Sequence, residues 1–210
     1  RGVSRMAVYE NYFPYQNISK ALSTTNIYWV YATNYNATKS GISCVYFKFQ
    51  NVSDHGVTFY SGYTEKNESK IANYSGNFYG LPMIAMNDST VERNTSNALY
   101  VYPETGGTIL PSQNFSLIYS DYQYCIIFLV LTKPIQIDGL FPENLDTSQN
   151  QCVLLYTDAQ AHLSINNFTG KARWCQQVFN NSCIKYNNQT YKQHFSNTCS
   201  GHYLEAPPAC

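Results

Sequence analysis

Cysteine and histidine are the residues of this chain with the widest chemistry, since both can serve in nucleophilic catalysis or bind a metal. The 210 residues contain seven cysteines and four histidines. No CxxC pair and no Cys/His spacing typical of a zinc site occurs, and no cysteine lies in a local sequence typical of a catalytic thiol. Gly106-Gly107 lacks the strand-to-helix context of a phosphate loop. We therefore expect no enzyme activity, no bound metal and no cofactor.

The cysteines are instead spread along the chain in the way expected for disulfide bonds. They are Cys44, Cys125, Cys152, Cys175, Cys183, Cys199 and Cys210. Bridges of this kind form in an oxidising compartment. Because the count is odd, one thiol stays unpaired, bonds to another chain, or belongs to a chain that was cut or altered, and the sequence leaves these alternatives open.

Asparagine supplies a second kind of chemistry, because Asn-x-Ser/Thr is the acceptor pattern for N-glycosylation. The pattern occurs at Asn17, Asn36, Asn51, Asn67, Asn73, Asn87, Asn94, Asn114, Asn167, Asn180 and Asn188. Chance placement in a chain of this composition would supply only about three or four such sites. The excess predicts a glycosylated, secreted protein.

The charge balance excludes two classes of partner. Lysine plus arginine and aspartate plus glutamate number 13 each, and charged residues make up 12% of the chain. A neutral, weakly charged protein has no footprint for nucleic acid or an anionic membrane. The longest apolar run, residues 125–131, is too short to span a bilayer, so we expect no membrane insertion. No signal peptide is visible, and we interpret the sequence as the mature form of an extracellular, monomeric protein.

The elements that must position these residues are predominantly strands. Aromatic residues make up 16% of the chain, and they cluster with β-branched residues in short segments bounded by turn residues. The predicted strands are 27–34, 43–52, 56–64, 70–74, 78–86, 98–102, 115–120, 124–131 and 152–157. Strands at hairpin spacing predict an all-β fold, a closed up-and-down antiparallel barrel of eight strands.

Two helices and one domain complete the prediction. A short helix is expected within residues 15–22, and near-helical spacing of apolar residues predicts one main helix over residues 172–186. The strand at 125–131 is apolar on both faces, so this C-terminal helix must pack outside the barrel. Residues 1–26 form an N-terminal segment that closes the barrel, and residues 27–210 form the barrel, helix and tail of a single domain.

Several segments together resemble the lipocalins of tick saliva, the histamine-binding protein family. They are IYWVYATNYN from residue 27, Cys44 in the second strand, NALYVY (97–102), YSDYQYCIIFLV (119–130), LLYTD (154–158), Cys175 in the helix and FSNTC (195–199). The resemblance covers roughly residues 15 to 200. It implies a lipocalin barrel that binds a small molecule.

The resemblance also implies the two usual bridges of the family, Cys44–Cys199 and Cys125–Cys175. The second agrees with geometry, because an antiparallel strand at 152–157 followed by a returning helix places Cys175 near Cys125. The same layout places Cys183 near Cys152. One further bridge is expected among Cys152, Cys183 and Cys210, and its pairing stays open.

The barrel interior departs from that of the amine-binding relatives, in which carboxylates and aromatic rings hold the ammonium group. By approximate alignment, the acidic positions of those relatives fall here on Ser23, Thr38, Ile126 and Val153. In the second strand, Val45, Phe47 and Phe49 share one face. The expected lining is Trp29, Tyr31, Tyr35, Phe47, Phe49, Phe59, Phe128 and Leu155. These side chains either line an apolar cavity or fill the barrel completely.

Three functions follow from the resemblance and this interior. The first is sequestration of a small hydrophobic or amphipathic host mediator, such as a lipid, eicosanoid or sterol, in the barrel. The second is inhibition of a host defence protein, for example a complement component, with the barrel as scaffold. For that function we expect a contact site in the sequon-free loop 133–146, formed by Ile135, Ile137, Leu140 and Phe141. The third is scavenging of histamine or serotonin.

Overall fold

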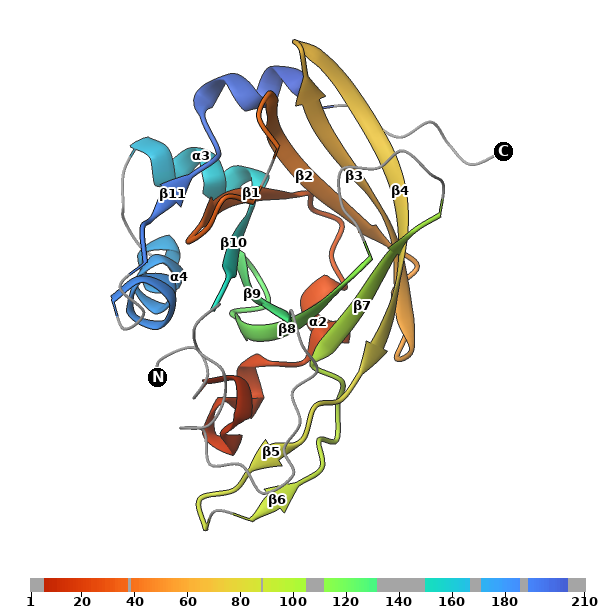
Figure 1. The fold of residues 1–210 in the computed structure, drawn as a ribbon, viewed down its shortest axis with the longest axis vertical. Coiled ribbons are helices and arrows are strands. Elements are labelled where there is room, and N and C mark those ends of the chain that lie inside the picture. Colours follow the sequence, from red (N-terminus) through yellow and green to blue (C-terminus); the bar gives the residue numbers. More distant parts are fainter. Residues whose placement is uncertain are drawn as a thin grey trace.

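The fold is a closed antiparallel β-barrel with helices packed on one side (Figure 1). The structure, a computed structural model, describes residues 6–37, 39–87, 89–104, 112–131, 150–166, 171–185 and 189–203. The barrel strands are β1 (Tyr28–Thr33), β2 (Ile42–Gln50), β3 (Gly56–Glu65), β4 (Glu68–Tyr79), β7 (Ala98–Pro103), β8 (Gln113–Ser120), β9 (Cys125–Leu131) and β10 (Cys152–Thr157). Each strand pairs with the next, and β10 closes the ring on β1. The predicted eight-stranded up-and-down barrel is therefore confirmed.

Three short strands lie outside the ring. Strand β11 (Lys192–Gln193) pairs with the end of β1, and β5 (Met83–Ile84) pairs with β6 (Thr90–Val91) in a separate hairpin. The expectation of two separate strands at 70–74 and 78–86 was wrong, because a single strand, β4, covers residues 68–79. Strand β4 runs unbroken to Tyr79, because each of its residues from Glu68 to Asn77 stays in register with β3, and the chain then leaves the barrel.

The N-terminal helices are η1 (Glu10–Tyr15) and α2 (Ile18–Leu22). Helix α2 lies within the predicted helical region 15–22, whereas η1 precedes that region and was not predicted. Helix α2 lies across one end of the barrel and buries Ile18 and Leu22 in its interior. Asn17 caps this helix, since its Oδ1 accepts a hydrogen bond from the Lys20 backbone N–H. The backbone N–H of Ile18 donates to Ser96 O, which attaches the helix to the chain entering β7.

Among the described residues, the C-terminal half contains helices besides the one predicted. Helix α3 (Asp158–Asn166) follows β10 directly, and α4 (Lys171–Phe179) continues into a π-helical turn, η3 (Asn180–Lys185). The expected single helix at 172–186 therefore corresponds to α4 and η3 together. Helix α3 was missed because its sequence, DAQAHLSIN, has no apolar stripe at helical spacing. A short 3-10 helix, η4 (Asn197–His202), ends the described chain near β2.

The barrel wall has an apolar core on each side along β1, β9 and β10. Alternate residues point inward, such as Val30, Ile126 and Leu155, and belong to the core inside the barrel. Their neighbours Trp29 and Tyr156 point outward and belong to a second core under α3 and α4. Figure 1 shows these helices beside β1 and β10. The doubly apolar strands are thus explained by the helical cover.

Three disulfide bonds attach the C-terminal half to the wall. They are Cys44–Cys199, Cys125–Cys175 and Cys152–Cys183. The first two are the pairs that the resemblance implies. The third pairs two of the three cysteines left open by the sequence, and Cys210 lies outside the described residues. The bridge from β2 starts at a bulge, where Cys44 has a φ of 51° and leaves the regular pairing with β3.

A partly buried arginine, Arg93, attaches the N-terminal segment to the excursion between β4 and β7. The Arg93 guanidinium donates hydrogen bonds to Leu81 O, Gln16 Oε1 and Ala7 O at 2.7–2.9 Å. Burial lowers the pKa of Arg93 to about 10, so the group stays charged at neutral pH. These contacts link three segments that are distant in sequence at the end of the barrel covered by α2.

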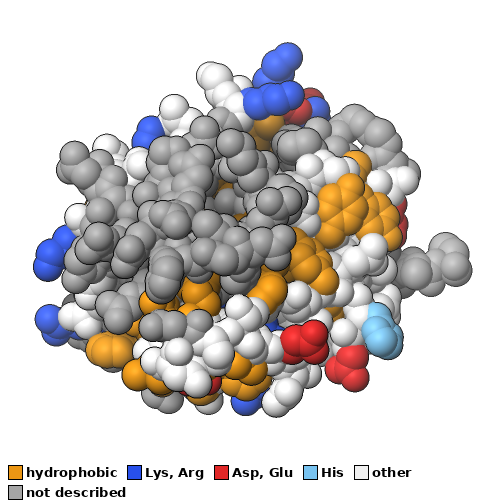
Figure 2. Space-filling model, turned by 60° about the horizontal axis from the view of Figure 1, so that its bottom comes forward, with side chains coloured by type: hydrophobic (Ala, Val, Ile, Leu, Met, Phe, Trp, Pro, Cys, Tyr) orange, Lys and Arg blue, Asp and Glu red, His pale blue; other side chains and the backbone are white. Residues whose placement is uncertain are grey.

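Charged groups are scattered over the surface. On the face drawn in Figure 2, several Lys and Arg side chains gather with an acidic one at the upper edge, and other charged groups are spread among polar and hydrophobic side chains. None of the described helices is long and apolar enough to cross a membrane.

Candidate functional site

The barrel encloses a cavity of about 250 Å³. The alternative of a completely filled barrel is therefore wrong. The lining residues come from β1, β2, β3, β7, β8, β9, β10 and the β1–β2 connection. They are Val30, Tyr35, Ala37, Lys39, Ile42, Val45, Phe47, Phe49, Phe59, Leu99, Val101, Gln113, Phe115, Phe128, Val153 and Leu155.

Phenylalanine rings form the main wall of the cavity. Phe47, Phe49 and Phe59 lie with centroids 5.5–6.2 Å apart, and Phe115 lies 5.7 Å from Phe128 on the strands β8 and β9. These spacings are typical of favourable aromatic packing. The rings meet because β2 and β3 present alternate residues to the interior, and Phe49 is directly opposite Phe59 in the register. The wall suits a flat or extended apolar molecule.

Polar groups reach the cavity at one end only. Tyr35 and Lys39 lie in the β1–β2 connection, and Gln113 begins β8. Burial raises the pKa of Tyr35 to about 12, so its hydroxyl is protonated at neutral pH and can donate a hydrogen bond. This end is opposite to the one that α2 covers, because α2 precedes the start of β1, whereas Tyr35 and Lys39 follow the end of that strand.

Lys39 is the charged group of this lining, and none of the described lining residues is a carboxylate. The nearby Glu65 forms an ion pair of 2.9 Å with Lys70. A hydrogen bond from Lys70, with smaller contributions from other lysines including Lys39, lowers the pKa of Glu65, so this carboxylate is ionised and engaged with Lys70. The cavity therefore offers an incoming molecule positive charge and hydrogen-bond donors.

Six of the eight residues predicted to line the barrel do so. They are Tyr35, Phe47, Phe49, Phe59, Phe128 and Leu155. The expectation was wrong for Trp29 and Tyr31, which point outward into the core under the helices. The reason is that the segment IYWVYA has no strongly polar residue on either face, so its sequence does not show which alternate residues of β1 point into the barrel.

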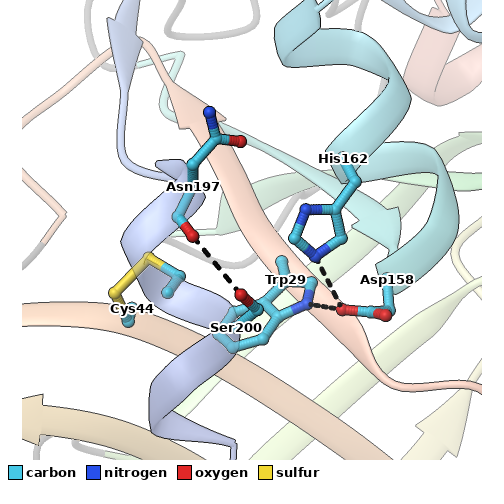
Figure 3. A network of polar contacts seen from close by, with 7 residues as sticks. Trp29, Cys44, Asp158, His162, Asn197 and Ser200 are labelled. Carbon is cyan, nitrogen blue, oxygen red and sulfur yellow. Dashed lines mark hydrogen bonds and ion pairs between the residues drawn. A yellow bond between two sulfur atoms is a disulfide. The ribbon is translucent and has the colours of Figure 1, made fainter.

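Trp29 has a structural role in the outer core (Figure 3). Its indole Nε1–H donates a hydrogen bond of 2.8 Å to Asp158 Oδ1 in the first turn of α3. His162 lies one turn further along α3, with Nε2 3.5 Å from the same oxygen. The Trp29 ring also packs edge-on to Tyr46 and 5.3 Å from Phe195. These contacts fix α3 and the C-terminal segment on the barrel wall.

The residues that the sequence did not identify fall into two groups. Val45 and Val153 share a strand face with the predicted lining residues Phe47 and Leu155, so the two-residue alternation could have identified them. Val30 lies on the face of β1 opposite to Trp29 and Tyr31, so it was missed when the wrong face of this strand was chosen. Lys39, Ile42 and other residues near the loops carry no such signal. Their position depends on how the β1–β2 connection folds over the end of the barrel.

The four positions aligned with the acidic residues of amine-binding relatives have different surroundings. Ser23 is exposed at the end of α2, and its hydroxyl donates to Ser19 O. Ile126 and Val153 are buried inside the barrel. Thr38 lies outside the described residues, as do Ile135, Ile137, Leu140 and Phe141 of the expected contact loop.

Most of the described sequon asparagines are exposed. These are Asn36, Asn51, Asn67, Asn73, Asn87, Asn94 and Asn180, while Asn17 and Asn114 are partly buried. Asn167 and Asn188 lie outside the described residues. The exposed asparagines are found in the turns after β1, β2 and β3, on the outer face of β4, in the excursion between β4 and β7, and directly after α4.

One group of residues has the spacing of a metal site but a different role. Asp121, Cys125 and Cys175 lie together, yet both sulfurs belong to one disulfide bond. Asp121 Oδ1 accepts hydrogen bonds from the backbone N–H groups of Gln123, Tyr124 and Cys125. The carboxylate therefore stabilises the β8–β9 turn.

A family model described as tick histamine binding protein matches residues 7–199. No curated protein sequence matches the chain. AM182, solved as its serotonin complex, superposes with a TM-score of 0.53 at 13% identity, over 87% of this chain and 92% of that chain. Insecticyanin from the tobacco hornworm Manduca sexta superposes with a TM-score of 0.50 at 9% identity, over 88% of this chain and 84% of the insecticyanin chain. Japanin from Rhipicephalus appendiculatus, solved with bound cholesterol, superposes with a TM-score of 0.47 at 12% identity, over 81% of this chain and 91% of the japanin chain. At these identities the likeness to AM182 and insecticyanin shows the fold alone.

Proposed function

Because this chain belongs to the tick histamine-binding protein family, we propose that it is a secreted lipocalin that sequesters a small hydrophobic or amphipathic host mediator in its barrel. The mediator is of the lipid, eicosanoid or sterol type. Removing such a molecule from the host would weaken host defence without any catalytic step.

The observation that carries this proposal is the apolar cavity of about 250 Å³. Ligand pockets of proteins typically measure about 300–1,000 Å³ and combine an apolar wall with a few polar groups. The volume of this cavity is just below that range, which favours a compact ligand or one that extends beyond the described wall. Phe47, Phe59 and Phe128 would contact the apolar body of the ligand.

The polar end of the ligand would face Tyr35, Lys39 and Gln113. Each of these side chains can donate a hydrogen bond, and Lys39 adds a positive charge. An acceptor or anionic end group is thus favoured over an ammonium group. Ammonium ligands are usually neutralised by carboxylates or aromatic cages, and none of the described lining residues is acidic.

The experiment is a binding titration of glycosylated protein with 11-(dansylamino)undecanoic acid, a fluorescent fatty acid, followed by competition. We expect micromolar binding that cholesterol or arachidonic acid displaces, whereas histamine and serotonin do not. Phe128→Trp, which places extra volume in the cavity, should abolish probe binding. Failure of the probe and of both lipids to bind would reject the proposal.

Amine scavenging is the third hypothesis, and serotonin belongs in the competition because the AM182 structure is a serotonin complex. By approximate alignment, the positions that are acidic in amine-binding relatives are occupied in this chain by Ser23, Thr38, Ile126 and Val153. None of these residues is acidic. Displacement of the probe by serotonin at lower concentration than by any lipid would favour amine scavenging over lipid sequestration.

Inhibition of a host defence protein, such as a complement component, is the second candidate. Trp174 on α4 is 60% exposed and Tyr15, at the end of η1, is 44% exposed. Exposed tryptophan and tyrosine are common at protein contact sites. Immobilised protein would be incubated with host serum, and retention of one complement component by the wild type but not by Trp174→Ser would support this function.

Secretion is part of the proposal. Three disulfide bonds within the described residues favour an oxidising compartment. The sequons favour passage through the secretory pathway, where they would be glycosylated. Expression in insect cells behind a heterologous signal sequence, followed by glycosidase treatment and mass measurement, tests whether the chain passes through the secretory pathway and carries glycans there.

A further inference from the structure

The outer face of β4, β7 and β8 carries a sequon asparagine between two tyrosines. Asn114 on β8 lies directly opposite Tyr100 on β7 in the register. The neighbours Leu99 and Phe115 line the cavity, so the alternation directs Tyr100 and Asn114 outward. Directly opposed side chains of an antiparallel pair have Cβ atoms about 4.5–5.5 Å apart. A group attached to Asn114 thus starts within reach of the Tyr100 ring.

Tyr79 on β4 orients the Asn114 amide. The Tyr79 hydroxyl donates a hydrogen bond of 2.7 Å to Asn114 Oδ1. Burial raises the pKa of Tyr79, which keeps the hydroxyl protonated as a donor. Because Oδ1 is held by Tyr79, Nδ2 is the amide atom that remains for a sugar.

Tyr100 presents an aromatic surface that no described residue covers fully. Its side chain is 38% exposed, and its ring is tilted against Tyr102 at a centroid distance of 5.9 Å. The C–H bonds on one face of a pyranose ring are weakly positive and pack well on the negative face of an aromatic ring. An exposed tyrosine beside an acceptor asparagine therefore matches the first sugar of an N-glycan.

We propose that Asn114 carries an N-glycan whose first N-acetylglucosamine packs on Tyr100 and forms part of the folded surface. In the attachment, the sugar C1 separates from a lipid-linked diphosphate donor and bonds to Nδ2. The nitrogen loses one proton, and the lipid diphosphate leaves. The sequon serine, Ser116, is fully buried in the folded barrel. Attachment therefore precedes the pairing of β8, and the folded hairpin then positions the sugar.

This packing gives the glycan two effects. It covers an exposed aromatic ring on the wall, which stabilises the barrel through its β7–β8 pair. It also excludes protein partners from this face, so that a partner would dock on the opposite side, where α3 and α4 lie.

The test is a double-mutant cycle on protein from a eukaryotic host. Glycopeptide mass spectrometry first measures the occupancy of Asn114. Thermal unfolding is then compared for the wild type, Tyr100→Ser, Asn114→Gln and the double variant. We expect Tyr100→Ser to lower the Tm of the glycosylated protein by about 2–4 °C, as for loss of one aromatic contact in a domain of this size. In the Asn114→Gln background the same substitution should change the Tm by less than about 1 °C.

Asn51→Gln is the matched control, because the Asn51 side chain donates to Thr58 Oγ1 and not to an aromatic residue. Its combination with Tyr100→Ser should be additive. Upfield-shifted N-acetylglucosamine protons in the wild type, absent from Tyr100→Ser, would support the contact directly. An unoccupied Asn114, or an equal effect of Tyr100→Ser in both backgrounds, would overturn the proposal.

Discussion

The ring of Tyr46 lies directly over Gly62 on the adjacent strand, where any side chain would collide with it. A Cβ built at Gly62 would lie 1.9 Å from Tyr46 Cζ. The two residues are opposed in the β2–β3 register. The Tyr46 ring is held from outside by Trp29 and Tyr203, with centroid distances of 4.9 and 5.2 Å. The absence of a side chain at Gly62 thus leaves room on the outer face of the barrel for the Tyr46 ring, which packs against Tyr203 at the end of η4.

Gly62→Ala should destabilise the protein, because the Tyr46 ring is fully buried and would have to shift against Trp29 and Tyr203, on which it packs. Overpacking of this kind costs about 1–3 kcal/mol. The change can be measured as the free energy of unfolding in urea. Gly80→Ala is the control, since its nearest atom, Arg93 Cβ, is 3.8 Å away, an ordinary contact distance. Equal stability of Gly62→Ala and the wild type would contradict the packing described for Tyr46.

Trp29→Phe should reduce stability without changing ligand affinity. The substitution removes the hydrogen bond to Asp158 and part of a fully buried ring, which together should cost about 1–3 kcal/mol. The residue is absent from the cavity lining, so the dissociation constant of the dansyl probe should stay within about twofold of the wild type. Urea unfolding and the probe titration separate the two effects. A large loss of affinity at unchanged stability would place Trp29 inside the barrel.

Lys39→Ala should weaken binding of an anionic amphiphile more than that of a neutral one. An exposed ion pair contributes roughly 0.2–1 kcal/mol, so we expect a decrease of about two- to fivefold for the fatty acid probe. The corresponding fatty alcohol, measured by competition, should be unaffected. Lys20→Ala provides the control, since Lys20 lies 4.3 Å from the Tyr122 ring, near the end covered by α2. Equal losses for acid and alcohol would argue against charge recognition by Lys39.

Stability should decrease as the pH falls below about 6.5, partly because of His194. Burial, with a smaller effect of Lys192, lowers the pKa of His194 below its ordinary value of 6.5. The unfolded chain therefore binds the proton more readily. The stabilisation from neutral His194 is present above pH 6.5 and is lost as the pH falls through the lowered value.

The comparison for His194 is urea unfolding at pH 7.5 and pH 5 for the wild type and His194→Asn. In the variant, the loss of stability between the two pH values should be smaller. Removing the Nε2 contact with Thr33 Oγ1, at 2.7 Å, should also lower its stability at pH 7.5. His55→Asn, in the exposed turn before β3, is the matched control variant. An unchanged pH dependence in His194→Asn would contradict the assignment.

The Cys152–Cys183 bridge should contribute strongly to stability. It closes a loop with a sequence separation of 31 residues, for which the chain-entropy model gives about 3–4 kcal/mol. The double variant Cys152→Ser, Cys183→Ser should lose stability of this order in urea unfolding. Cys210→Ser should retain the wild-type value, because the other six cysteines are paired. A peptide map without reduction that joins Cys210 to Cys152 or Cys183 would disprove this pairing.

Much of the barrel could be predicted from local pattern. Val45, Phe47 and Phe49 alternate with Tyr46, Lys48 and Gln50, and this period of two assigns one face of β2 to the interior. The turn residues around Asp54 and Gly56 then place β3 beside it. For these strands the inward residues follow from the sequence, because only one parity places lysine and glutamine on the outside.

Local pattern is insufficient where both faces of an element are covered or neither is strongly apolar. Trp29 and Val30 are equally apolar, so the direction of each became clear only when α3 and Phe195 were seen to cover one side. Helix α3 has no apolar stripe in its sequence. It is held on the barrel wall by tertiary contacts such as the hydrogen bond from Trp29 to Asp158. The third disulfide likewise depended on the return path of the chain after β10.

The composition and the sequon and cysteine patterns thus predicted a glycosylated, disulfide-linked β-protein, and the resemblance of several segments indicated its family. Only the tertiary structure placed Lys39, Tyr35 and Gln113 together at one end of the cavity, because they come from a connection and a strand start with no periodic signal. Likewise, Asn114 and Tyr100 became neighbours only through the register of β7 and β8. Periodicity assigns a residue to one face of its strand, whereas the register between paired strands decides which side chains on that face become neighbours.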